Sequence, residues 1–166
     1  MEYTPVILFA FNRPEGLKAI IESLLQNEEA KHSVLYVFVD GPRFQRKGEV
    51  ENVEKVRDYV KSITGFKEVH YKFALQNKGL GNSVIKGVTE VINRYGKAIV
   101  LEDDLILAPN FLFFMNQGLD KYKEETSVFS ICGYSNKVKV PKDYSYLKEP
   151  WPHHFRPMWR ILGIGA

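Results

Sequence analysis

Residues 97–105 have the sequence Lys97-Ala98-Ile99-Val100-Leu101-Glu102-Asp103-Asp104-Leu105. The apolar run favours a short buried β-strand, and three consecutive carboxylates follow it. In a parallel α/β sheet, ligands bind beyond the carboxyl ends of the strands, which is where these acids would lie. Because adjacent carboxylates repel one another, a cation is their natural partner, and hard oxygen ligands favour Mg²⁺ or Mn²⁺. The stretch predicts a divalent metal that holds a phosphorylated ligand; acids at this position also occur as solvated loop residues or helix caps.

Strand-like and helix-like segments alternate on both sides of this stretch. Continuous apolar runs such as residues 6–11 are typical of strands buried on both faces. Helical spacing of apolar residues begins at Pro14, with Leu17, Ile20, Ile21, Leu24 and Leu25 on one face. We expect strands at 5–11, 33–40, 68–73, 98–101 and 127–132, and helices at 14–25, 53–63, 84–92 and 109–122. The alternation predicts an α/β fold with three α/β/α layers and a mostly parallel, twisted sheet.

Composition limits the class of protein. With 166 residues, 45% hydrophobic and 26% charged, the chain has the profile of one globular domain. A net charge of +3, scattered along the chain, argues against nucleic acid as a partner. The single cysteine, Cys132, excludes an internal disulfide. No apolar run approaches the roughly 20 residues of a membrane span, and the first run is too short for a signal peptide. We expect a cytoplasmic protein that works near, or peripherally on, the inner membrane.

The regular pattern fades near residue 135. We therefore expect a ligand-binding α/β domain over residues 1–135 and an irregular, aromatic-rich segment over 136–166, punctuated by four prolines. Trp151 and Trp159 are candidates for stacking on sugar, and His153-His154 is more typical of a surface pair than of a metal site. Unpaired aromatic residues in this segment would also suit a subunit interface in a homo-oligomer.

Four predicted strand-to-helix junctions carry polar residues and should meet at one edge of the sheet. They are Asn12-Arg13, Asp40-Gly41, Asn77-Lys78-Gly79 and Glu102-Asp103-Asp104. Together they would suit a nucleotide bound across the carboxyl ends of the strands. Each also has a simpler explanation: Arg13 as an exposed residue at a helix start, Asp40 as a turn residue, and the glycines as a turn before a helix.

As a set, these motifs resemble the GT-A fold of nucleotide-sugar glycosyltransferases, closest to bacterial family 2-like sugar transferases and the N-acetylglucosaminyltransferase I group. The residues that carry the resemblance are 6–14, 35–42, 77–83 with Gly87, and 100–105. Their order and spacing agree over about residues 4–135. The resemblance implies transfer of a sugar from a nucleoside diphosphate, with UDP as the expected nucleotide, in glycan or polysaccharide synthesis.

The resemblance also implies roles for individual residues. Glu102-Asp103-Asp104 matches the acidic "DxD" motif, in which Asp104 would bind Mn²⁺ or Mg²⁺ and Asp103 would lie near the ribose and a metal-bound water. Asp40 would contact the base. The remaining donor-site residues would be Asn12 and Arg13 at the nucleotide, Asn77, Lys78 and Gly79 at the diphosphate or sugar, and Glu102 within the acidic motif.

Acceptor binding is where the chain departs from the resemblance. The catalytic base of an inverting family member comes from a later acceptor region, and here the late carboxylates Asp143 and Glu149 sit in no recognisable base motif. The base is therefore unassigned, and the acceptor would be a glycan or lipid-linked hydroxyl. The main alternative is a non-catalytic module that binds a nucleotide-sugar or glycan. A nucleotidyltransferase would need a basic, glycine-rich loop near the first strand. A receiver domain would need acids where Asn12-Arg13 stand.

Overall fold

The first predicted strand forms the centre of the sheet. In the computed structural model, which describes residues 3–133 and 162–165, strand β1 (Val6–Ala10) is buried along its whole length. It pairs in parallel with β2 (Val34–Val39) on one side and with β4 (Lys97–Glu102) on the other. Continuous burial explains why this sequence is apolar at successive positions rather than at alternate ones.

The sheet has the order β3-β2-β1-β4-β6-β5. Strand β3 (Glu68–Phe73) pairs in parallel with β2 and lies at the edge, in agreement with its alternating sequence. Strand β6 (Leu162–Gly165) lies between β4 and β5 (Ser130–Ile131) and is antiparallel to both. Four neighbouring strands are thus parallel, and the predicted mostly parallel sheet is confirmed.

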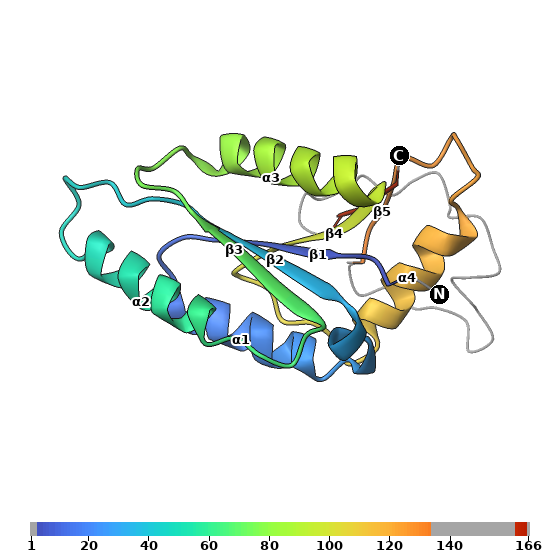
Figure 1. Cartoon of the computed structure of the whole chain (residues 1–166), viewed down its shortest axis with the longest axis horizontal. Coiled ribbons are helices and arrows are strands. Elements are labelled where there is room, and N and C mark those ends of the chain that lie inside the picture. The colour runs from blue at the N-terminus through green and yellow to red at the C-terminus, as the bar shows by residue number, and fades with distance from the viewer. Residues whose placement is uncertain (1–2, 134–161, 166) are drawn as a thin grey trace, which may run out of the picture.

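Helices cover both faces of this sheet. Helices α1 (Pro14–Leu25) and α2 (Glu49–Lys61) pack on one face, and α3 (Leu80–Tyr95) packs on the other (Figure 1). Helix α4 (Phe111–Lys121) contributes to the core on the α1 side, and the short 3-10 helix η1 (Glu28–His32) follows α1. Alternate residues of β1 enter the two cores, with Leu8 facing α1 and Phe9 facing α3. This is the predicted three-layer α/β/α fold.

Three details differ from the predictions. The helix η1 was not predicted, because its five residues are too few to form a periodic pattern. Strand β5 is only two residues long, because the backbone turns just before it, where the Val128 N–H donates to the Glu125 carbonyl at 3.0 Å. Leu25, expected on the apolar face of α1, is 42% exposed because it is the last residue of the helix.

The end of the chain also differs. Residues 136–166 were predicted to be irregular, but Leu162–Gly165 form β6, so the prediction is wrong for these four residues. On the side of β4 away from β1, the backbone N–H and C=O groups can pair with any segment of chain that reaches them. The local sequence contains no pattern that predicts such pairing. The aromatic and histidine candidates, Trp151, His153, His154 and Trp159, lie outside the described residues. Within the described residues, no helix is long and apolar enough to cross a membrane.

Candidate functional site

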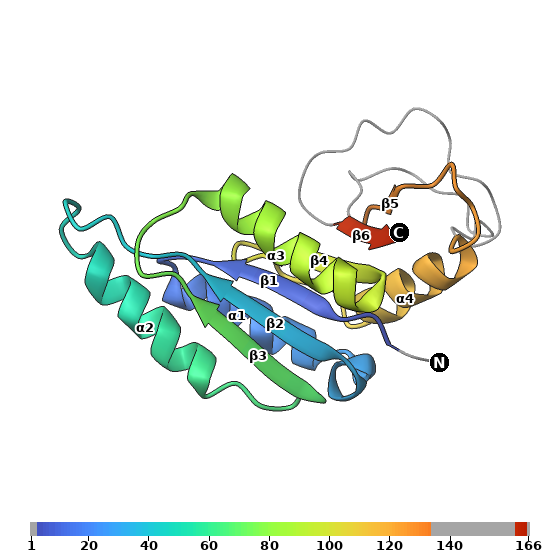
Figure 2. The same cartoon turned by 45° about the horizontal axis from the view of Figure 1, so that its top comes forward.

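The four polar junctions lie at the same edge of the sheet. Strands β1 to β4 are parallel, so their carboxyl ends point the same way, as Figure 2 shows. The end of β1 contacts two of the junctions directly. The Asp40 N–H donates to the Ala10 carbonyl at 3.1 Å, and the Phe11 N–H donates to Asp103 Oδ2 at 3.1 Å. The predicted meeting of these residues is therefore present in the fold.

Asp103 is a buried carboxylate that joins β4 to β1. It is only 8% exposed, and its bond from the Phe11 N–H holds the two strand ends together. Burial raises the pKa of Asp103, while the Phe11 N–H and the nearby Arg13 guanidinium act in the opposite direction. A Cβ on Gly16 would lie 2.4 Å from the Asp103 carbonyl oxygen, so α1 packs directly against this turn. Asp103 is therefore placed to hold the next residue, Asp104, in position.

Asp104 is more accessible and faces a cation. Its Oδ2 lies 3.5 Å from Arg13 Nη1, which is also 3.7 Å from Asp103 Oδ1. The Arg13 side chain is 60% exposed and the Asp104 side chain 24% exposed. An arginine at the start of α1 thus balances two carboxylates at the end of β4, at the surface of the molecule.

The three carboxylates do not form one cluster. Glu102 pairs with Phe9 across the sheet, so it lies on the α3 face, whereas strand alternation turns Asp103 toward α1. No group of three His, Cys, Asp or Glu residues that could hold a metal ion occurs among the described residues. The predicted cation site, with Asp104 as its ligand, stays a prediction. One or two of them can still hold a metal together with ligand phosphates, which is the usual arrangement for Mg²⁺.

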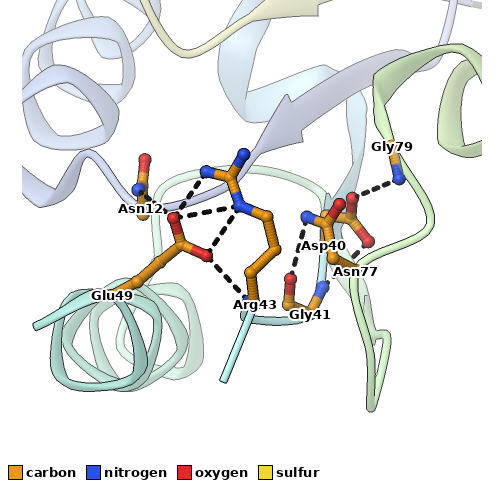
Figure 3. Close-up of polar contacts among 7 residues, drawn as sticks. All are labelled: Asn12, Asp40, Gly41, Arg43, Glu49, Asn77 and Gly79. Atoms are coloured by element: carbon orange, nitrogen blue, oxygen red, sulfur yellow. Dashed lines mark hydrogen bonds and ion pairs between the residues drawn. The ribbon is translucent and has the colours of Figure 1, made fainter. Parts of the chain in front are cut away.

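Asp40 joins two loops. The carboxylate is 8% exposed; Oδ1 accepts from the Gly41 N–H at 2.8 Å and the Lys78 N–H at 2.9 Å, and Oδ2 from the Gly79 N–H at 3.0 Å. Asn77 Nδ2 donates to the Gly41 carbonyl at 3.1 Å, which adds a second link (Figure 3). The sequence offered a base contact or a local turn for Asp40; the structure places it as the bridge between the loops after β2 and β3.

Two residues of this edge were missed by sequence reasoning. Glu49, 5% exposed, accepts hydrogen bonds from the Arg43 N–H at 2.7 Å, Nε at 3.0 Å and Nη2 at 2.5 Å. These bonds outweigh burial and lower the pKa of Glu49 to about 2. The Arg43 guanidinium lies 5.2 Å from the centre of the Phe11 ring, and Asn12 Nδ2 donates to Glu49 Oε2 at 3.4 Å (Figure 3). In the sequence, both charges belong to a polar segment typical of a solvated loop.

Helix α3 begins beside these loops. Gly79 precedes the helix with φ +78°, a conformation that favours glycine, and a Cβ there or on Gly81 would meet nothing within 4 Å. Lys78 is exposed. The backbone at this helix start is therefore open to close approach by a ligand, as the two glycines suggested.

A separate hollow lies on the α3 face of β2 and β3. It has a volume of about 260 Å³, and Tyr36, His70, Lys72, Glu90 and Arg94 are among its lining residues. The Tyr36 hydroxyl lies 3.0 Å from the Tyr95 hydroxyl, and burial together with this contact raises the pKa of Tyr36 to about 12. None of the predicted site residues lines the hollow.

No family model matches this chain. Among solved structures, it is similar to S. aureus TarS with a TM-score of 0.49 and 15% identity, over 72% of this chain and 20% of that chain. A TarS 1-349 structure gives the same values over 33% of its length. The mannosyltransferase PcManGT from Pyrobaculum calidifontis, in complex with GDP-Man and Mn2+, gives a TM-score of 0.49 and 12% identity, over 85% of this chain and 37% of that chain. The chain thus spans little more than a third of these proteins at most, and likeness at this level assigns it neither a family nor an activity.

Proposed function

We propose that the carboxyl edge of the sheet binds a nucleoside diphosphate sugar with Mg²⁺ or Mn²⁺, and that the protein transfers the sugar to a hydroxyl of a glycan or lipid-linked acceptor. The observation that carries the proposal is the convergence around the end of β1. Arg13, Asp103 and Asp104 lie within ion-pair distance on one side, and on the other Asp40 holds the Asn77–Gly79 loop. The sequence resemblance to GT-A glycosyltransferases supports the same ligand.

The donor set fits a hard divalent cation. Asp104 offers carboxylate oxygen at the surface, and Asp103 behind it has one oxygen engaged by the Phe11 N–H. Mg²⁺ is commonly bound through one or two carboxylates, with waters and substrate phosphates completing its shell, so a full protein cage is not needed. When bound there, the cation would act as a Lewis acid that makes the nucleoside diphosphate a better leaving group.

The chain's own residues account for the rest of the site. The exposed guanidinium of Arg13 has donors for phosphate oxygens in addition to its contact with Asp104. At the opposite side, exposed Lys78 and the first N–H groups of α3 favour a phosphate, because a helix N-terminus is electropositive. Asp40 fixes this loop by accepting hydrogen bonds from the Lys78 and Gly79 N–H groups. The nucleotide would then lie between the loops that follow β1, β2 and β3.

Titration calorimetry of UDP, with and without Mn²⁺, tests the proposal. We expect wild-type binding to require Mn²⁺ and Asp104→Ala to weaken it about ten- to a hundredfold, since a charged contact is lost. Asp120→Ala is the matched control, because Asp120 lies on α4 and pairs only at 3.5 Å with Lys123. Absence of binding to UDP, GDP, CDP and dTDP alike would contradict the proposal. Slow release of free sugar from a bound donor would separate a transferase from a binding module.

A further inference from the structure

Large apolar side chains are exposed on the two loops beside the candidate site. Phe44 is 64% exposed, Leu75 84% and Leu80 54%. The loops that carry them are tied together, because Asp40 and Gly41 bind the backbone and side chain of residues 77–79. The loops that carry these residues lie at one end of the molecule, where α2 and α3 begin (Figures 1 and 2). We call the surface formed by residues 44–47, 75 and 78–80 the loop face.

The loop face is also basic. Residues 41–48 contain Arg43, Arg46 and Lys47, residues 74–86 contain Lys78 and Lys86, and neither segment contains Asp or Glu. Arg43 is neutralised by Glu49, whereas Arg46, Lys47 and Lys78 are exposed and form no ion pair within the described part of the chain. The nearby acids of α2 already have partners.

Those partners leave little negative charge beside the loop face. Glu51 lies 2.8 Å from Lys55, and Glu54 lies 2.5 Å from Arg57. Arg57 in turn donates to the Ala74 carbonyl at 2.6 Å, which holds it next to the Leu75 loop. The local surface thus combines unpaired positive charge with apolar tips.

We propose that the loop face binds the surface of an anionic lipid bilayer. Apolar loop tips can enter the boundary between headgroups and acyl chains, while basic residues are attracted to anionic headgroups. Phe44 and Leu75 are exposed on separate loops and Leu80 at the start of α3, and the hollow described above lies elsewhere, between β2, β3 and α3. Separate tips with basic neighbours suit a fluid, negatively charged surface.

The proposal gives the molecule an orientation. The carboxyl edge of the sheet faces the bilayer, and Asp104 and Arg13 lie at that edge. An acceptor hydroxyl on a lipid-linked glycan would then be presented on the side of the donor site. This last consequence rests on the proposed function, whereas binding of the bilayer does not.

Co-sedimentation of the full chain with vesicles tests the inference, without nucleotide or metal. We expect binding to vesicles that contain phosphatidylglycerol, weaker binding at high salt, and little binding to phosphatidylcholine alone. Phe44→Ser with Leu75→Ser should weaken binding about tenfold through lost apolar burial. Arg46→Gln with Lys47→Gln should weaken it roughly fivefold for each charge removed.

Phe129→Ser is the matched control. Phe129 is 73% exposed but precedes β5, whose Ser130 is level with Ala98 at the start of β4, so it lies toward the opposite edge of the sheet. We expect this variant to bind vesicles like wild type, and circular dichroism should show all variants folded.

Three results would overturn the inference: no binding to anionic vesicles, equal binding to neutral ones, or an equal loss with Phe129→Ser. Self-association that Phe44→Ser abolishes, measured by sedimentation velocity without vesicle binding, would show instead that a second copy covers the loop face. UDP titration of the same variants keeps the two proposals apart, since none of these substitutions removes a residue placed at the nucleotide.

Discussion

At the scale of single residues, the carboxylates of the edge divide into two kinds. Asp40, Asp103 and Glu49 are buried and accept hydrogen bonds from the protein's own donors, which fix the loops. Asp104 lies nearer the surface with Arg13. Buried, bonded carboxylates are suited to holding a site in shape, while the accessible one is suited to meeting a ligand.

Glu49 gives a prediction for pH. Its pKa falls from 4.5 to about 2 because Arg43 binds the ionised form. The folded state therefore binds this proton less tightly than the unfolded state does, so the contribution is complete above about pH 4.5 and lost as the pH falls toward 2. We expect Glu49→Gln to be less stable than wild type at neutral pH and the difference to shrink across this window, in urea melts at several pH values.

Glu51→Gln is the comparison for this experiment. Glu51 also pairs with a cation, Lys55, but is 71% exposed, and exposed pairs add little stability. Its substitution should change stability only slightly at any pH. A deficit of Glu49→Gln that stayed constant from neutral pH to pH 2 would show that the Arg43–Glu49 pair is not its source.

At the scale of elements, glycines set how closely loops and helices approach. A Cβ on Gly41 would lie 2.3–2.6 Å from backbone atoms of Gln76, and one on Gly87 would lie 2.9 Å from the Phe9 ring. The first contact lets the loops after β2 and β3 touch, and the second lets α3 lie close to β1. The sequence motif around Gly41 thus has a steric cause.

A pair of glycine substitutions tests this explanation. Gly41→Ala should destabilise the fold by roughly 1–3 kcal/mol, because backbone atoms must move apart. Gly81→Ala should stabilise it by about 0.4–1 kcal/mol, since the residue is helical and a Cβ there meets nothing within 4 Å. Urea denaturation measures both. Equal effects of the two substitutions would mean that the close approach at Gly41 relaxes without cost.

Much of the fold at this scale could be predicted from the sequence. The spacing of Leu17, Ile20, Ile21 and Leu24 placed α1, and the continuous run at 6–11 placed β1 in a doubly covered position. Strand β6 could not be predicted, because its pairing with β4 depends on a segment about sixty residues away in sequence. Likewise, the Arg43–Glu49 pair depends on loop conformation rather than on periodicity.

At the scale of the whole molecule, the sheet order predicts how stability is distributed. Strand β1 lies between β2 and β4 and is fully buried, whereas β3 lies at the edge and all six of its residues are partly or fully exposed. Local opening is easiest where burial is least. We expect amides of β1 and β4 to exchange hydrogen slowest, and those of β3 on average roughly tenfold or more faster.

Hydrogen exchange read residue by residue by NMR measures this difference. Strand β4 is the internal control, because it is buried from Ala98 to Leu101 and should match β1. Protection of β3 equal to that of β1 would contradict the expected gradient and indicate that the edge opens only with the whole sheet.

The sequence by itself determined the layers of this protein and the edge at which its polar junctions meet. Both follow from local periodicity and from the rule that strand–helix–strand units are parallel and right-handed. Only the tertiary structure decided which carboxylates are buried and fix the loops, and which one is accessible to a ligand. Strand alternation separates Glu102 from Asp103, and Asp40 and Glu49 take partners that are distant in the chain. Burial and hydrogen bonding depend on neighbours in the folded structure, and the identities of three adjacent residues cannot specify those neighbours.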